Sequence, residues 1–287
     1  MLVLGRQTFA DDAALMMAIV NRTPDSFYDR GATFADAAAM ERVDAAVAEG
    51  ADIIDIGGVK AGPGVDVDLA EEIRRVVPFV TAVRARHPEV VISVDTWRAP
   101  VGRAAALEGA DLLNDTWAGA DPTLADVAAE FGVGIVCSQT GGAVPRRRPH
   151  RVRYADVVAD VIADVTGQAE RLVARGVPRE GILVDPTHDF GKNTFHGLAL
   201  LRHCDQLVET GWPVLMALSN KDFVGETLGV TEVTERLEGT LAATALAAAA
   251  GARVFRAHEV ARTRKVVEMV ASIRGTRPPT RCLRALA

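Results

Sequence analysis

The chain has 287 residues, of which 49% are hydrophobic and only 5% aromatic, and its formal net charge is -6. This acidic balance argues against a nucleic-acid-binding surface and favours small-molecule chemistry. One α/β barrel of about 250 residues accounts for the length, and a core of Ala, Val, Leu and Ile suits buried parallel strands. We expect a single domain spanning 1–287, with a basic loop at 141–153 and a tail at 275–287 as appendages.

Neither a membrane partner nor a disulfide framework is expected. The longest near-apolar stretch, 241–250, has about half the length that a bilayer-spanning helix needs, and the N-terminus lacks a charged segment followed by a signal core. Cys137, Cys204 and Cys282 are odd in number and widely spaced, which predicts three free thiols. These features predict a cytoplasmic location.

Eight short apolar runs of β type alternate with Ala-rich helical segments, at 17–20, 53–56, 90–94, 112–113, 133–137, 182–184, 214–218 and 253–256. A glycine follows several of the helical segments, as helix C-termini prefer. Such alternation implies parallel strands joined by crossover helices, and eight units predict a TIM (β/α)₈ barrel. A doubly wound sheet is the competing fold, but no glycine-rich phosphate fingerprint follows the first strand.

Most of these runs end on polar side chains, namely Asn21, Asp55, Asp95, Asn114, Asp115, Asp185, Lys221, Arg256 and His258. A parallel barrel gathers the C-terminal ends of its strands at one mouth, where active sites of this fold lie. Carboxylates and amides suit a ligand rich in N–H donors, whereas Arg256 and His258 suit an anion such as phosphate. A lone strand-end Asp could equally cap a helix, and a desolvated Lys221 could form a Schiff base, which leaves an aldolase-like enzyme open.

Motifs in order along the chain resemble the dihydropteroate synthase family. They are Asn21-Arg22-Thr23-Pro24-Asp25-Ser26-Phe27, Asp52-Ile53-Ile54-Asp55-Ile56-Gly57-Gly58, Ile92-Ser93-Val94-Asp95-Thr96, Asn114-Asp115, Asp185-Pro186 with Phe190-Gly191-Lys192, Ser219 with Lys221, and Arg256 with His258. The match extends from about residue 17 to 260. It implies a TIM barrel, usually a homodimer, that joins dihydropterin methyl diphosphate to p-aminobenzoate in folate biosynthesis with Mg²⁺ present.

The resemblance also implies roles for individual residues. The expected pterin ligands are Asp95, Asn114, Asp185 and Lys221, and Asp95 would stabilise the positive charge that develops as diphosphate leaves. The expected diphosphate ligands are Arg256 and His258, and Asn21 would hold Mg²⁺ or diphosphate. The expected p-aminobenzoate pocket consists of Phe27, Pro63, Phe190 and Ser219. We predict Asp95, Lys221 and Arg256 as the catalytic set, with flexible loops at 22–34 and 59–67 closing over it.

The second of these loops departs from the family motif. Where the family continues from Gly-Gly into Glu-Ser-Thr-Arg-Pro-Gly, this chain reads Val59-Lys60-Ala61-Gly62-Pro63-Gly64. A hydroxyl and a guanidinium are therefore absent. At roughly 1.5–3 kcal/mol for each charge-assisted contact, two losses would lower transition-state stabilisation by on the order of 10² to 10⁴.

Other substrate-facing segments differ as well. The family's Asp-Pro-Gly-Ile-Gly-Phe-Gly-Lys is replaced by 185–192, in which His188 and Asp189 are expected where small residues let the pterin approach. Met-His-Met is replaced by Cys137-Ser138-Gln139, giving a smaller and more polar expected floor, and an arginine and a valine of the family are replaced by Asn220 and Arg22. The charge run at 141–153 is interpreted as a solvated loop, with an anion-attracting flap over the mouth as the alternative.

We therefore expect a divergent dihydropteroate synthase paralogue, weak or inactive as a synthase, that keeps an aryl-amine pocket of the p-aminobenzoate or sulfa type. One alternative is an active synthase in which Arg22, Arg30 or Lys60 supplies the diphosphate contact. The other is a folate-dependent methyltransferase domain with a corrinoid partner. The segment 21–27 and the tripeptide Arg256-Ala257-His258 favour the synthase family over that domain.

Overall fold

A computed structural model describes residues 1–23, 35–62, 64–146 and 152–283. Within those ranges eight parallel strands form a nearly closed barrel, in the order β8-β7-β6-β5-β4-β3-β10-β9, and a bridge between Val184 and Val214 joins its two ends. The barrel strands are β3 (Leu15–Asn21), β4 (Ile53–Gly57), β5 (Val91–Asp95), β6 (Leu112–Asp115), β7 (Gly134–Ser138), β8 (Ile182–Asp185), β9 (Leu215–Met216) and β10 (Val254–Ala257). The predicted TIM barrel is confirmed, as are all eight predicted strands.

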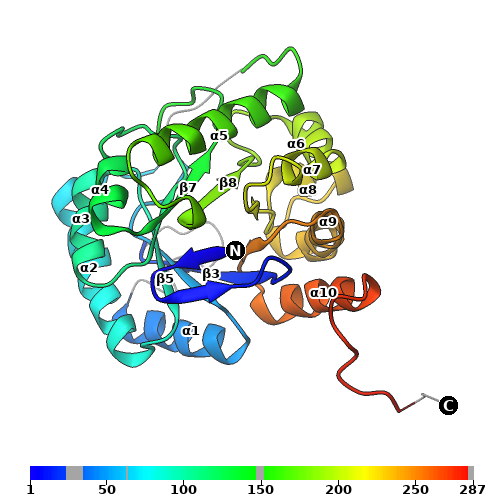
Figure 1. The fold of residues 1–287 in the computed structure, drawn as a ribbon, viewed down its shortest axis with the longest axis horizontal. Helices are drawn as coiled ribbons and strands as arrows, with labels where there is room; N and C mark the ends of the chain where they lie inside the picture. Colours follow the sequence, from blue (N-terminus) through cyan, green and yellow to red (C-terminus); the bar gives the residue numbers. More distant parts are fainter. Residues whose placement is uncertain (24–34, 63, 147–151, 284–287) are drawn as a thin grey trace.

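Helices surround the barrel in the described ranges (Figure 1). They are α1 (Asp36–Ala48), α2 (Leu69–Arg86), α3 (Ala99–Leu107), α4 (Leu124–Phe131), α5 (Val157–Ala174), α6 (Thr194–Arg202), α7 (Cys204–Val208), α8 (Asp222–Leu228), α9 (Leu237–Ala250) and α10 (Val260–Ile273), with short 3₁₀ turns at Arg179–Gly181 and Val233–Arg236. No described helix is both long and apolar enough to cross a bilayer. Cys137, Cys204 and Cys282 are free, as predicted.

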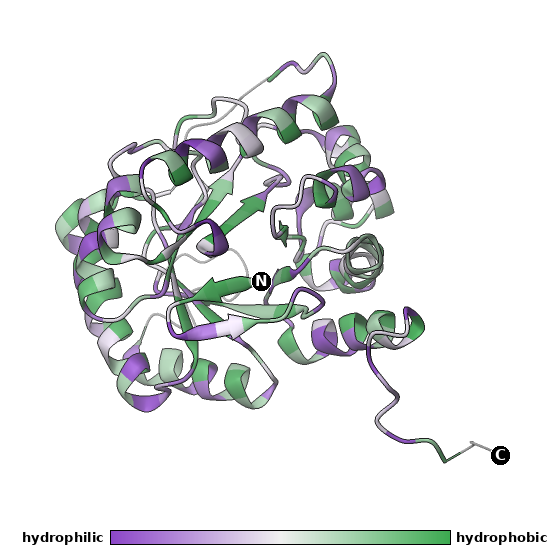
Figure 2. Cartoon of the chain, in the orientation of Figure 1, coloured by the Kyte–Doolittle hydropathy of each residue, from purple (hydrophilic) through white to green (hydrophobic). Residues whose placement is uncertain are grey.

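Successive side chains of each barrel strand point to opposite sides, so that each strand serves two environments. In β3, Met16, Ala18 and Val20 pack with the helices, whereas Leu15 and Met17 belong to a separate cluster inside the barrel. Figure 2 shows the apolar strands within a ring of helices that carry polar residues as well. The alternation corrects one expectation, because Cys137 packs on the helix side and forms no part of the site floor.

An N-terminal hairpin, β1 (Leu2–Leu4) and β2 (Gln7–Phe9), was absent from the sequence prediction. Leu2 and Leu4 are fully buried and pack with Leu112, Leu183 and the other residues inside the barrel. The hairpin lies across one end of the barrel (Figure 1). Because these leucines contact the N-terminal half of the strands, this end is closed by apolar packing, and ligand access is left to the opposite end.

The loop after β8 bends in a way that the sequence alone does not reveal. Thr187 and Asp189 have φ values of 53° and 69°, in the left-handed region that favours the glycines of the family motif. His188, between them, points away from the barrel mouth and is fully buried, with its ring 5.2 Å from that of Phe223 and beside Gly197. The expectation that His188 stands in the path of a pterin was therefore wrong.

Burial makes His188 an acid-sensitive element of the fold. It lowers the pKa of His188 to about 3, from an ordinary value of 6.5. Between these two pH values the unfolded chain binds a proton that the folded chain excludes. His188 therefore leaves the free energy of unfolding unchanged above about pH 6.5. Below that pH it lowers the free energy of unfolding by about 1.4 kcal/mol per pH unit.

We predict that His188→Ile, which restores the residue type of the family motif, weakens the pH dependence of stability. Between pH 7.5 and pH 5.0 the free energy of unfolding of this variant should fall by about 2 kcal/mol less than that of the wild type. Urea unfolding at the two pH values measures the difference, and His203→Gln, at a partly exposed histidine, is the control. An equal fall in wild type and His188→Ile would contradict this assignment.

Candidate functional site

A cavity of about 660 Å³ opens at the C-terminal ends of the barrel strands. The predicted site residues that the structure describes all line it: Asn21, Asp95, Asn114, Asp185, Phe190, Ser219, Lys221, Arg256 and His258. Phe27 and Pro63 lie outside the described residues. The alternation of side chains along a strand explains which strand-end residues line the cavity. Asn114 faces the cavity, whereas the adjacent Asp115 faces the other way and accepts hydrogen bonds from the backbone N–H groups of Trp117 and Gly119.

Asp55 lies beneath the cavity and organises its floor. The carboxylate is fully buried and accepts a hydrogen bond from Ser93 Oγ at 2.6 Å and from Asn114 Nδ2 at 3.2 Å. Arg256 Nε donates to it at 2.6 Å. One carboxylate on β4 therefore fixes side chains from β5, β6 and β10, so that Asn114 and Arg256 are held in place before any ligand arrives.

Asp95 and Arg256 form the second ion pair of this floor. Arg256 Nη2 donates to Asp95 Oδ2 at 3.0 Å, and Thr116 Oγ1 donates to Asp95 Oδ1 at 3.0 Å. Burial raises the pKa of Asp95, the positive charge of Arg256 opposes that rise, and the carboxylate of Asp55 adds to it. Since Arg256 already bridges Asp55 and Asp95, its guanidinium is oriented by the protein and presents its remaining N–H groups to the cavity.

Asp185 stands on the opposite side of the floor, close to two lysines. Its Oδ1 accepts from the backbone N–H of Thr187 at 2.7 Å, and burial raises the pKa of Asp185 while Lys221 and Lys192 oppose the rise. Lys192 Nζ donates to Gln139 Oε1 at 2.8 Å and to the carbonyl of Phe190 at 3.2 Å, and burial lowers its pKa to about 7. Lys192 thus braces the loop after β8.

Aromatic rings form one wall of the cavity. The ring of Phe190 lies edge-on to Trp117, with centroids 5.2 Å apart, and Lys221 Nζ lies 4.7 Å from the Phe190 centroid. Burial lowers the pKa of Lys221. Thr116 and Trp117 also line the cavity and were not predicted as site residues from the sequence. Both residues directly follow the strand-end pair Asn114-Asp115, and this position is the sequence feature that could have identified them as site residues.

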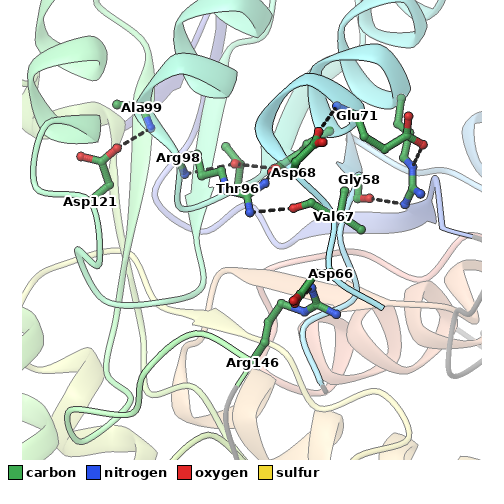
Figure 3. A network of polar contacts seen from close by, with 12 residues as sticks. Gly58, Asp66, Val67, Asp68, Glu71, Thr96, Arg98, Ala99, Asp121 and Arg146 are labelled. Atoms are coloured by element: carbon green, nitrogen blue, oxygen red, sulfur yellow. Dashed lines mark hydrogen bonds and ion pairs between the residues drawn. The ribbon is translucent and has the colours of Figure 1, made fainter. Parts of the chain in front are cut away.

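The second loop forms part of the rim of the cavity, where Lys60, Ala61 and Gly62 line it. Arg98 and Arg146, outside the loop, donate to its backbone carbonyls, and Arg75 donates to the carbonyl of Gly58, the residue that precedes it. Arg75 Nη1 donates to the carbonyl of Gly58 at 3.0 Å, and Arg98 Nη2 to that of Val67 at 2.8 Å. Figure 3 shows Arg98 reaching the loop from beside Thr96 and Arg146 lying against Asp66.

Arg146 reaches the same loop from the far side of the mouth. Its Nη2 donates to the carbonyl of Val65 at 2.8 Å, and its Nη1 lies 3.7 Å from Asp66 Oδ1. The side chain is only 11% exposed and lines the cavity. The prediction of a wholly solvated loop at 141–153 is therefore wrong for Arg146, which connects that loop to 59–67.

Arg22 is buried on the helix side of β3. It forms an ion pair with Asp36, and its guanidinium lies 4.6 Å from the Phe79 ring centroid. Arg22 does not line the cavity, so the expectation that it could contact a diphosphate there was wrong. Arg30 lies outside the described residues. Of the three cations named as substitutes for the missing arginine, Lys60 is the one that the described structure brings to the cavity.

Comparison with known proteins agrees with this architecture. The "Pterin binding enzyme" family matches residues 17–258. "Inactive dihydropteroate synthase 2" of Mycobacterium leprae is 67% identical over 100% of this chain and 99% of its own length, and the Mycobacterium tuberculosis protein of that name is 68% identical over 97% and 88%. "Dihydropteroate synthase" of Streptococcus pyogenes is 36% identical over 92% of this chain and 97% of its own length.

Solved structures place the chain in the same group. The Yersinia pestis dihydropteroate synthase, solved with a sulfonamide drug complex, is 32% identical with a TM-score of 0.90, over 96% of this chain and 99% of that one. Mycobacterium tuberculosis Rv1207 is 55% identical with a TM-score of 0.75, over 96% and 99%. The chain therefore belongs to the pterin-binding enzyme family, as a divergent homologue of dihydropteroate synthase.

Proposed function

We propose that this chain is a ligand-binding barrel that has lost dihydropteroate synthase turnover and retains a pocket for an aryl amine. One observation carries the proposal: the strand-end residues converge on one cavity, whereas the loop at its rim carries Ala61 and Gly62 in place of a hydroxyl and a guanidinium. Groups that act only in the transition state contribute to turnover, and their loss leaves ground-state binding largely intact. The names of the mycobacterial relatives support the loss of activity.

The floor of the cavity suits a heterocycle rich in N–H donors. The second oxygen of Asp185 would accept from such a ligand, because Oδ1 is already bonded to Thr187. Asn114, held by Asp55, would supply an amide oxygen on the neighbouring wall. In the active family Asp95 and Arg256 would stabilise the charges separated as diphosphate leaves. Here they support binding, with Arg256 and His258 facing the anionic part of the ligand.

The aromatic wall suits the aryl-amine partner. An aryl ring would stack against Phe190 within reach of Lys221 and Ser219, which line the same cavity. A Xanthomonas albilineans dihydropteroate synthase, 36% identical, has been solved with 4-aminobenzoic acid, and the Yersinia enzyme with a sulfonamide drug complex. These names support a benzoate-like or sulfa-like ligand class for the pocket of this chain.

Mg²⁺ would bind only together with a phosphate-bearing ligand. Among the described residues no group of three His, Cys, Asp or Glu side chains is placed to hold a metal ion. The side-chain oxygen of Asn21, which lines the cavity, fits Mg²⁺ as one oxygen ligand among several, the remainder being water and diphosphate oxygens. Bound there, the ion would neutralise the diphosphate. The proposal also includes a homodimer, as the family resemblance implies, and a cytoplasmic location.

An active synthase is the second candidate, and Lys60 is the observation that favours it. Lys60 lines the cavity and would replace the positive charge of the missing arginine. An ammonium lacks the planar, bidentate donor geometry of a guanidinium, and Lys60 stands two residues earlier in the loop than that arginine. We therefore favour the inactive interpretation.

We predict that the purified chain turns over dihydropterin methyl diphosphate and p-aminobenzoate at least about 100-fold more slowly than an active synthase, because two charge-assisted contacts are absent. A steady-state assay with Mg²⁺, run beside the Streptococcus pyogenes enzyme, measures both rates. The proposal fails if the two enzymes differ by less than about tenfold.

We further predict that Arg146→Ala loosens the second loop. Removing the donor to the Val65 carbonyl and the charge beside Asp66 should increase hydrogen exchange of the 59–67 amides about tenfold, equivalent to about 1.4 kcal/mol. Hydrogen exchange with mass spectrometry measures this, and Arg153→Ala, at an exposed residue of the same basic loop, is the matched control. Equal exchange in both variants would show that Arg146 does not fasten the loop.

A further inference from the structure

Asp189 brings a carboxylate into the cavity where the family motif has glycine. Asp189 and Lys221 both line the cavity. The carboxylate is fixed in position, because Oδ2 accepts from the backbone N–H of Asp222 at 2.6 Å and Oδ1 from that of Phe223 at 3.3 Å. The backbone keeps the left-handed conformation that glycine favours, with a φ of 69°. The exchange of residue type thus adds a fixed negative charge without changing the bend.

Lys221 lines the same cavity, and it directly precedes Asp222, whose backbone N–H binds this carboxylate. Burial lowers the pKa of Lys221, and among the charges that oppose this fall Asp189 is the strongest, ahead of Asp185 and Asp222, while Arg256 adds to the fall. Lys221 Nζ also lies 4.7 Å from the centroid of the Phe190 ring, where an aryl ligand would stack. The positive charge that a ligand carboxylate would seek therefore already has a protein carboxylate in the same cavity.

A benzoate placed against Phe190 would meet an unfavourable field. Its carboxylate would approach Lys221 beside the fixed carboxylate of Asp189, and like charges in a partly desolvated site repel strongly. A neutral aryl amide or sulfonamide avoids this repulsion. Such a ligand can also donate an N–H to an oxygen of Asp189, a hydrogen bond that is strengthened by the charge of the acceptor.

We propose that Asp189 selects the charge of the aryl ligand, so that the pocket takes a neutral aryl amine bearing an amide or sulfonamide N–H in preference to p-aminobenzoate. This inference rests on the proposed aryl-amine pocket and specifies its ligand class. Asp189 is the specificity-determining residue, and Phe190 supplies the surface that neutral and anionic aryl ligands share.

Calorimetric titration with p-aminobenzamide and p-aminobenzoate at pH 7.5 tests the proposal, because the two probes differ mainly in charge. The wild type should bind the amide at least tenfold more tightly than the benzoate. Asp189→Gly, which suits the left-handed backbone, should bind the benzoate at least tenfold more tightly than the wild type does. Asp189→Asn, which keeps the size of the side chain, should give an intermediate preference.

Ala118→Gly is the control, since it places glycine at another left-handed position, with φ of 56°, at a residue that does not line the cavity, and it removes no charge. It should retain the preference of the wild type. A wild type that binds the benzoate as tightly as the amide would overturn the proposal. So would an Asp189→Gly variant that keeps the preference of the wild type.

A measurement without ligand separates this inference from the proposed function. Because the neutral amine is the nucleophile, loss of the Asp189 charge should make acetylation of Lys221 by an N-hydroxysuccinimide ester at least threefold faster in Asp189→Asn. Peptide mass spectrometry measures the rate, with Lys60 and Lys265 in the same sample as references. Absence of binding by either ligand to every variant would refute the aryl-amine pocket, and an unchanged acetylation rate would refute the pairing of Asp189 with Lys221.

Discussion

The alternation of side chains along parallel strands is the constraint on which the structure depends. Each barrel strand sends one set of residues to the helices and the other to the barrel interior. Closure of the barrel then divides the inner residues into two layers. Leu15, Leu112 and Leu183 pack beneath, with the N-terminal hairpin, whereas Asp95, Asn114 and Asp185 reach the open end. Hydrophobic core and candidate site are thus successive layers of the same strands.

That constraint also explains how far the sequence could predict the molecule. Eight apolar runs, most of which end on a polar residue, were sufficient to predict the barrel and most of the residues at its mouth. The β1–β2 hairpin was not predictable in this way, because strands of three residues carry too little periodicity. The orientations of His188 and Arg22 depend on loop conformation and on packing against helices. Arg146 looked like part of a solvated charge run because its partners, the Gly62 and Val65 carbonyls, are backbone groups distant in sequence.

The floor keeps the residues of the family motif and the rim does not, and these two facts have different physical consequences. Asp55, Asp95 and Arg256 form a buried charge network in which each partner compensates the desolvation of the others, so that loss of one would leave an unpaired buried charge. The rim residues Ala61 and Gly62 take part in no such network. The loop that carries them is held through its backbone carbonyls by Arg98 and Arg146, and the preceding carbonyl of Gly58 accepts from Arg75. A paralogue can therefore lose its chemistry at the rim while the binding floor persists.

Titration with sulfanilamide tests most directly whether the binding pocket persists in a chain that has lost synthase turnover. The wild type should show saturable binding at one site per chain, and Phe190→Ala should weaken that binding at least tenfold, because Phe190 provides the stacking surface. No detectable binding at millimolar sulfanilamide, or binding that Phe190→Ala leaves unchanged, would contradict the account.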